Sequence, residues 1–179
     1  VTLDAKRPGD LVYVLGTTRR ELGGSEFFAI LGCVGNAVPR VDAGQALALY
    51  RQVARATDAE LCHSLHTPAL GGLGVALAKV AMGGGLGLDL DLTAVPAEAG
   101  LAVAELLFSE TNSRFVATVS PRHQAAFERL FAGLPFACIG RTVMEPVLHL
   151  RHGPRSVLAV PVGEVINRDR LSRAINGHD

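Results

Sequence analysis

The segment 70–82 contains one charged residue, Lys79, and is otherwise made of glycine and apolar side chains. A helix at the surface of a globular protein keeps a polar face, whereas this segment has apolar residues on every face apart from Lys79. We therefore predict a helix that is buried and covered on both sides. Such a helix favours a fold in which helices and a sheet pack in layers.

Composition excludes several classes of function. The 179 residues carry 17 Lys and Arg and 17 Asp and Glu, so the formal net charge is zero and no basic field is available for nucleic acid or an anionic membrane. Gly, Pro, Lys or Asp interrupts each apolar stretch before the roughly 20 residues that span a bilayer, and no signal peptide is visible. Three widely spaced cysteines are typical of reduced thiols in a cytoplasmic protein.

The order of predicted elements favours a mixed sheet. Helix starts are marked by Asp42, a plausible N-cap, and by Ser120 followed by Pro121. Strands are predicted at 10–16, 61–65, 86–92, 114–119, 136–140, 147–150 and 157–160, and helices at 26–31, 43–56, 70–82, 99–108, from 120 onward, and at 162–175. Strands and helices do not alternate regularly, so we expect an α/β mixed sheet with helices packed on it rather than a doubly wound fold.

Gly23, Gly24, Ser25 and Glu26 follow the first predicted strand. Paired glycines let backbone N–H groups approach an anion, and a helix N-terminus would add its dipole. Glu26 could hold a magnesium ion or cap the helix. The competing interpretation, which the motif alone favours, is a simple turn with a capping carboxylate.

Gly71, Gly72 and Gly74 open the buried helix and form a second possible phosphate cradle. The pattern lacks the spacing of a dinucleotide fingerprint, and the chain has no Walker A sequence. Close packing of the helix explains these glycines as well and is the favoured interpretation. The later glycines at 83–87 lie at the wrong end of a helix for anions and indicate a turn.

Cys62, His63 and His66 suggest a metal site at first sight. Zinc needs three or four ligands from separate segments, and no second Cys/His pair completes a set. On a regular strand Cys62 and His66 would share one face. We expect no metal here.

Ser109 and Glu110 stand between a predicted helix and a strand, with Arg114 four residues after Glu110. The local interpretation is an ion pair at a helix end. The functional interpretation is the polar edge of a ligand cleft.

Four segments, in order, resemble the C-terminal domain of the formylglycinamidine ribonucleotide synthase family. They are LGTTRRELGGSEF (15–27), CHSLHTPALGGLGVALAKVAMGGGLGLDLDL (62–92), LFSETNSRFVATVS (107–120) and IGRTVMEPVLHL (139–150). The resemblance runs from about residue 9 to 175 and points to the second of the two C-terminal-type domains in this amidotransferase. It implies a three-layer α/β/α mixed sheet of the aminoimidazole ribonucleotide (AIR) synthase C-terminal-domain type, partly ferredoxin-like.

The resemblance also implies an activity. In this family ATP activates the formamide oxygen of formylglycinamide ribonucleotide (FGAR), and ammonia from a glutaminase partner then gives the amidine (FGAM). ATP and Mg²⁺ belong mainly to N-terminal AIR-synthase-type domains, which this chain lacks. Since it begins at Val1, we expect residues 1–179 to be one domain excised from a longer cytoplasmic enzyme and inactive alone. The resemblance is compatible with a homodimer.

One departure from the family pattern matters. The family commonly has His-Asp-x-Ser-Asp-Gly-Gly-Leu where this chain has His66 to Leu73, so Thr67 and Leu70 replace two carboxylates that could bind magnesium. Either this half of the enzyme is a pseudo-active site, or its cleft binds a nucleotide without a local metal. We favour the pseudo-active site and expect no catalytic residue and no metal here. The candidate ligand-binding residues are Gly23, Gly24, Ser25, Glu26, His66, Gly71, Gly72, Ser109, Glu110 and Arg114.

Two alternatives stay open at this point. The chain could serve only as a structural and interaction module that holds neighbouring domains. It could also belong to another ATP-dependent enzyme of the superfamily, such as aminoimidazole ribonucleotide synthetase, thiamine-phosphate kinase or selenophosphate synthetase.

Overall fold

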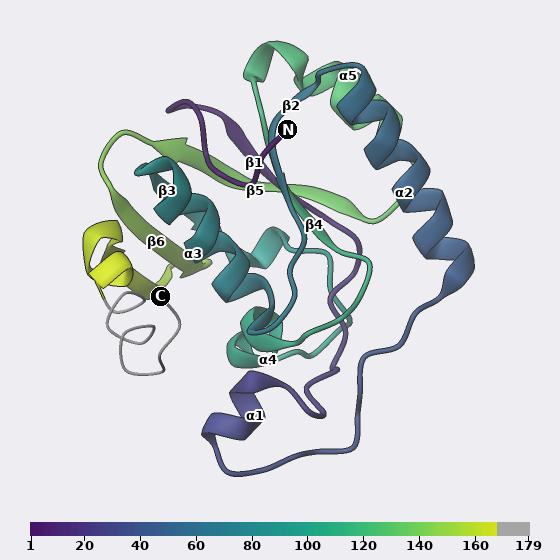
Figure 1. The fold of residues 1–179 in the computed structure, drawn as a ribbon, viewed down its shortest axis with the longest axis vertical. Coiled ribbons are helices and arrows are strands. Elements are labelled where there is room, and N and C mark those ends of the chain that lie inside the picture. Colours follow the sequence, from purple (N-terminus) through teal and green to yellow (C-terminus); the bar gives the residue numbers. More distant parts are fainter. Residues whose placement is uncertain (168–179) are drawn as a thin grey trace.

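In the computed structural model, which describes residues 1–167, seven strands form one mixed sheet (Figure 1). The strand order is β2-β4-β1-β5-β3-β6-β7, and every neighbouring pair is antiparallel except β3 and β6. The strands are β1 (Leu11–Leu15), β2 (Cys62–His66), β3 (Gly87–Asp91), β4 (Phe115–Val119), β5 (Phe136–Val143), β6 (Val147–His152) and β7 (Arg155–Pro161). The mixed sheet expected from the sequence is confirmed.

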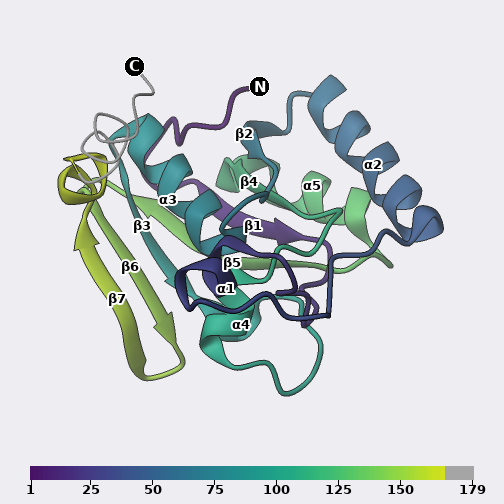
Figure 2. The same ribbon diagram turned by 60° about the horizontal axis from the view of Figure 1, so that its bottom comes forward.

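Helices cover both faces of this sheet (Figure 2). The helices are α1 (Glu26–Ile30), α2 (Ala43–Asp58), α3 (Gly72–Gly84), α4 (Val103–Phe108) and α5 (Gln124–Phe131), with short 3₁₀ turns η1 (Leu92–Ala94) and η2 (Pro121–His123). On one face α3 packs against α4, and on the other α2 packs against α5. No helix in residues 1–167 is long and apolar enough to cross a membrane.

The central strand β1 shows how the three layers arise. Its side chains alternate, so Val12 and Val14 join the core beneath α3 while Tyr13 and Leu15 join the core beneath α2 and α5. All four are fully buried. A strand that is apolar on both faces needs cover on both, which is the layered fold that the sequence predicted.

The predicted buried helix is confirmed as α3. Its residues Leu73, Ala76, Leu77 and Val80 are at most 2% exposed. The sheet and α4 cover it from one side, and the N-terminal segment crosses its other side, where the Ala5 amide donates to the Val80 carbonyl over 3.1 Å. The outer face of the helix is only partly covered, because Val75, Ala78 and Met82 are half-buried and Lys79 is exposed. The predicted burial is thus confirmed for the inner face, and the prediction of cover on both sides is wrong.

The sheet is covered unevenly. Within the described residues, the core on the α2 and α5 side contains no side chain of β3, β6 or β7, so this half of the sheet has helices on one face only. Asp89 and Asp91 point to the uncovered face, where Asp91 accepts a hydrogen bond from Arg151. The strand with one wet face predicted at 86–92 is thereby confirmed. At the margin, β7 pairs with β6 alone among residues 1–167.

Several predicted boundaries move for local reasons. The helix predicted at 99–108 begins only at Val103, because Gly100 has a φ of 76° and the Glu105 carboxylate accepts from the Ala102 amide over 2.8 Å to cap it. The strand predicted at 136–140 continues to Val143. Residues 162–167 are helical, and the rest of the helix predicted at 162–175 lies outside the described residues.

The prediction that Cys62 and His66 share a strand face is wrong. The register of β2 against β4 shifts between Cys62 and Ser64, which inserts one extra residue and reverses the alternation. Cys62 therefore packs beneath α2 and α5, whereas His66 lies opposite Val116, whose side chain belongs to the α3 side.

A charge placed in α3 should destabilise the domain strongly. Ala76→Glu would bury an unpaired carboxylate, and we expect it to lower the free energy of unfolding by several kcal/mol. The matched control, Arg51→Glu on the exposed surface of α2, should cost less than about 1 kcal/mol. Urea unfolding of both variants beside the parent measures the difference. An Ala76→Glu protein with the parental midpoint would contradict the burial of α3.

Candidate functional site

The candidate residues from the sequence gather at one edge of the sheet. The C-terminal ends of β1 and β2 meet the N-terminal ends of β4 and β5 there, as the pairs Leu15–Phe115, Leu15–Phe136 and His66–Val116 show. The starts of α1 and α3 lie at the same edge, since Glu110 contacts both. Loops that are far apart in the sequence therefore enclose one polar region.

Glu110 joins the two predicted phosphate cradles. Its Oε1 accepts hydrogen bonds from the Gly71 amide over 2.8 Å and from the Glu26 amide over 3.0 Å. These amides belong to the starts of α3 and α1, where anions are favoured. The carboxylate of the chain thus occupies the position that a ligand anion would take.

The other amides of the first cradle are already used. The Gly23 amide donates to the Ala37 carbonyl over 2.8 Å, and the Gly24 amide donates to the Val34 carbonyl over 2.7 Å. Ser25, rather than Glu26, caps α1 by accepting from the Phe28 amide over 3.3 Å. This segment is a turn whose amides pair with the loop between α1 and α2, residues 31–42. The simpler interpretation of the motif therefore fits these contacts.

The glycines before α3 serve close packing. Gly71 and Gly72 have φ values of 78° and 64°, which few other residues adopt. A Cβ on Gly72 would collide with the backbone of Leu107, Phe108 and Ser109 at the end of α4. The start of α3 is thus pressed against the end of α4, and this contact brings Gly71 to Glu110.

Arg114 is fully buried at the centre of this edge. Its guanidinium donates to the Thr111 carbonyl over 3.0 Å, to the Thr18 hydroxyl over 2.9 Å and to the Ser109 carbonyl over 2.6 Å. Burial lowers the pKa of Arg114 to about 10, while the negative charges of Glu21 and Glu110 oppose that shift. The residue stays cationic at neutral pH and holds two loops together, the one after β1 and the one between α4 and β4.

Two further buried groups complete the network. The Ser109 hydroxyl donates to the Arg19 carbonyl and accepts from the Glu21 amide over 3.0 Å. Glu21, which the sequence analysis missed, is 8% exposed. Its Oε1 accepts from the Arg40 amide over 3.2 Å, and its Oε2 finds no hydrogen-bond partner in residues 1–167. A single Glu in a polar loop gives no sequence signal of such burial.

His66 stands apart from this network. The half-buried ring lies at the end of β2, and burial lowers its pKa, with a smaller effect from the positive charge of Lys79. No hydrogen bond joins it to Glu110 or Arg114 within the described residues. The structure thus brings together Glu26, Gly71, Gly72, Ser109, Glu110 and Arg114, and leaves His66 beside them.

This edge does not fit the magnesium ion that the family resemblance associates with ATP. In residues 1–167, no three His, Cys, Asp or Glu side chains gather where they could hold a metal. The neighbours of Glu110 are N–H donors, which suit an anion and not a cation. Leu70, at one of the two positions where the family has a carboxylate, is 65% exposed.

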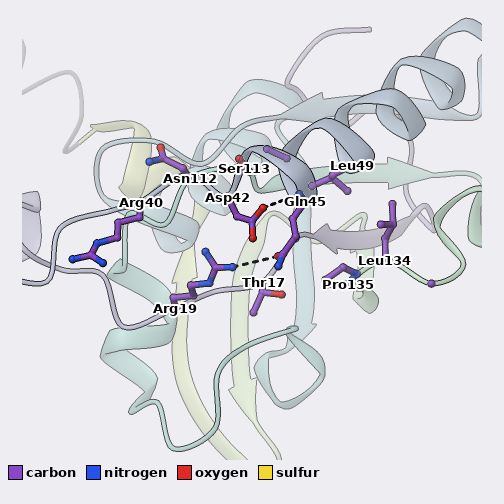
Figure 3. Close-up of a pocket in the computed structure, with 13 residues that line it drawn as sticks. Thr17, Arg19, Arg40, Asp42, Gln45, Leu49, Asn112, Ser113, Leu134 and Pro135 are labelled. Carbon is purple, nitrogen blue, oxygen red and sulfur yellow. Dashed lines mark hydrogen bonds between the residues drawn. The ribbon is translucent and has the colours of Figure 1, made fainter.

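A cavity of about 270 Å³ lies next to this network, towards α2 (Figure 3). It opens between the residues after β1, the first turns of α2, and the loops before β4 and β5. Its polar lining includes Thr17, Arg19, Asp42, Gln45 and Ser113. The sequence analysis marked Asp42 only as a cap and proposed none of these side chains as ligand contacts, because no motif links such distant positions.

Comparison with solved structures shows the same fold elsewhere. The PurL protein of Thermotoga maritima, in a structure described as complexed with FGAR, superposes with a TM-score of 0.82 and 22% identity, covering 92% of this chain and 29% of that chain. The hydrogenase maturation protein HypE superposes with a TM-score of 0.64 and 17% identity, covering 89% of this chain and 55% of that one. At these identities the likeness concerns the fold alone.

Sequence relatives are more similar. The phosphoribosylformylglycinamidine synthase subunits PurL of Thermococcus sibiricus and Thermococcus gammatolerans are each 37% identical over 157 residues, which is 88% of this chain and 22% of the relative. The chain thus spans about a fifth of the length of these relatives. Residues 7–153 match the family described as AIR synthase related protein, C-terminal domain. With most of its length matched in this way, the chain belongs to the family of AIR synthase related C-terminal domains.

Proposed function

We propose that this chain is the C-terminal domain of a PurL-type phosphoribosylformylglycinamidine synthase, which converts FGAR to FGAM with ATP and glutamine in purine biosynthesis. The 37% identity to two Thermococcus PurL subunits supports this assignment, because the match extends over 88% of the chain. ATP and Mg²⁺ would be held by other domains of the enzyme. A structure described as PurLQS of Thermotoga maritima contains a domain of this fold, and by analogy a glutaminase would be a partner here.

Within that enzyme we assign this domain a non-catalytic role. The observation that carries this assignment is the Glu110 carboxylate on the Gly71 and Glu26 amides. A negative charge of the chain repels phosphate from the place where two helix starts would attract it. The domain would then form one wall of the enzyme's ligand cleft, while Glu110 keeps its own anion-binding position occupied.

Exposed aliphatic side chains favour the additional role of an interaction module. The exposed fraction is 82% for Ile30, 74% for Val34 and 61% for Val41. Ile30 belongs to α1, and the two valines belong to the loop 31–42 that follows it. Several large aliphatic side chains exposed along one segment are typical of surfaces that contact another protein or domain. Holding neighbouring domains and closing a cleft are compatible roles, since they use different surfaces.

The assignment to the synthase can be tested by domain exchange. This chain would replace the matched segment of the Thermococcus sibiricus PurL subunit, and FGAM formation from FGAR, ATP and ammonium would be measured. We expect ammonium-dependent turnover well above that of the subunit without the segment. Residues 1–179 alone should give no turnover. A chimera that unfolds cooperatively but remains inactive would contradict the assignment, and turnover by the isolated chain would contradict the non-catalytic role.

The occupation of the two amides by Glu110 leads to a separate prediction. Glu110→Ala removes the acceptor of two amides, so we expect stability to fall by about 1–3 kcal/mol. It also frees both amides for an external anion. Inorganic phosphate should therefore raise the melting temperature of this variant more than that of the parent.

The matched control is Glu26→Ala, which removes a nearby exposed carboxylate and leaves both amides paired with Glu110. Thermal unfolding with and without phosphate, at constant ionic strength, compares the three proteins. A parent that phosphate stabilises as strongly as the Glu110→Ala protein would show that the cradle is open.

A further inference from the structure

The cavity beside α2 adjoins the Glu110 network through the backbone of Arg19 and Arg40, but it has no part in the proposed function. Its walls come from residues 16–19 after β1, the first turns of α2, residues 112–113 and residues 133–135 (Figure 3). None of the residues that contact the Glu110 carboxylate lines it. Its chemistry can therefore be considered independently.

Hydrogen bonds between the loops fix the walls. The Gly16 amide donates to the Pro135 carbonyl over 2.8 Å, and the hydroxyls of Tyr50 and Ser113 lie 2.9 Å apart. Ser113 has a φ of 59°, which is uncommon for a residue with a side chain, and a Cβ on Gly16 would collide with the Ser113 carbonyl. A strained, tightly packed loop keeps one shape, so the cavity exists before a ligand arrives.

One side of the cavity is apolar. Ala46 and Leu49, each 4% exposed, lie on the inner face of α2, and Leu134 and Pro135 face them from the loop before β5. Such surfaces pack well against a flat ring. A volume of about 270 Å³ is at the small end of ligand pockets, which fits a ligand with one ring system and excludes a dinucleotide.

The rim offers donors and one acceptor. The Arg19 guanidinium donates to the Gln45 side-chain oxygen over a long 3.3 Å, whereas the exposed Arg40 side chain points away from Gln45 (Figure 3). At the start of α2 the amides of Gln45 and Ala46 already donate to Asp42, so this helix end contributes the positive end of its dipole. Asp42 uses Oδ1 to accept from the Gln45 amide over 3.0 Å, which leaves Oδ2 for a hydroxyl donor.

We propose that this cavity binds a nucleoside monophosphate. The ring would lie on the apolar side formed by Leu49 and Pro135, a sugar hydroxyl would donate to Asp42, and the phosphate would face the Arg19 guanidinium on the rim. This combination of a flat ring, hydroxyls and an anion is the ligand class that uses all three parts of the lining. Inorganic phosphate would use only the rim, and a neutral nucleoside would leave the Arg19 guanidinium without an anion.

Calorimetric titration of the full 179-residue chain tests the proposal with AMP, adenosine and inorganic phosphate as probes. We expect AMP to bind at least tenfold more tightly than either other probe. Arg19→Gln should weaken AMP binding at least tenfold, and Ala46→Leu, which fills the cavity, should remove binding of AMP and adenosine alike. Arg51→Gln, on the exposed surface of the same helix, should bind AMP as the parent does.

Three outcomes would contradict the proposal. The folded parent does not bind AMP, phosphate binds as tightly as AMP, or neither variant changes AMP binding. Thermal unfolding of each variant without ligand verifies its fold, and if Ala46→Leu does not fold, Arg19→Gln decides alone. Since the domain-exchange experiment measures turnover and this one measures binding to the chain alone, the two proposals can fail separately.

Discussion

The buried guanidinium of Arg114 is the interaction on which the functional edge depends. Burying an unpaired charge would cost several kcal/mol, so the group must be surrounded by acceptors and balancing charge. Two carbonyls and a hydroxyl from the loops around Thr18 and Ser109 supply the acceptors, and Glu21 and Glu110 supply the charge. Glu110 in turn fixes the starts of α1 and α3. The positions of these loops and of the starts of α1 and α3 therefore depend on one network of charges and hydrogen bonds.

The sequence predicted the fold well wherever local chemistry was strong. Helix α3 was evident from its lack of charge, and Asp42 marked the start of α2 because its side chain can cap an amide locally. The errors have two causes. The register shift in β2 depends on its pairing with β4, a tertiary contact that periodicity does not record. The late start of α4 is local, because a turn at Gly100 and the cap by Glu105 leave the helix only six residues.

The sequence indicated several candidate residues but not the contacts between them. The glycine motifs and Glu110 were each noted, yet only the fold shows that the carboxylate fills the space beside the Gly71 amide. Glu21 and the cavity beside α2 were missed, since their partners are distant in sequence and belong to no motif. Whether the candidate residues bind a ligand stays a prediction, and so does the absence of a metal.

The margin of the sheet at β7 has a consequence for how this domain behaves in solution. Among residues 1–167, β7 pairs on one side only, so its outer backbone groups remain available to another strand. Arg155 and Pro161 disfavour pairing with another strand at the two ends of β7. The charge of Arg155 repels the same charge on a second copy, and Pro161 lacks an amide proton. Within the part of the chain that the structure describes, the middle of the strand, around Leu158 and Ala159, has no such protection. Self-association at high protein concentration would therefore begin at this margin, by the addition of an intermolecular strand.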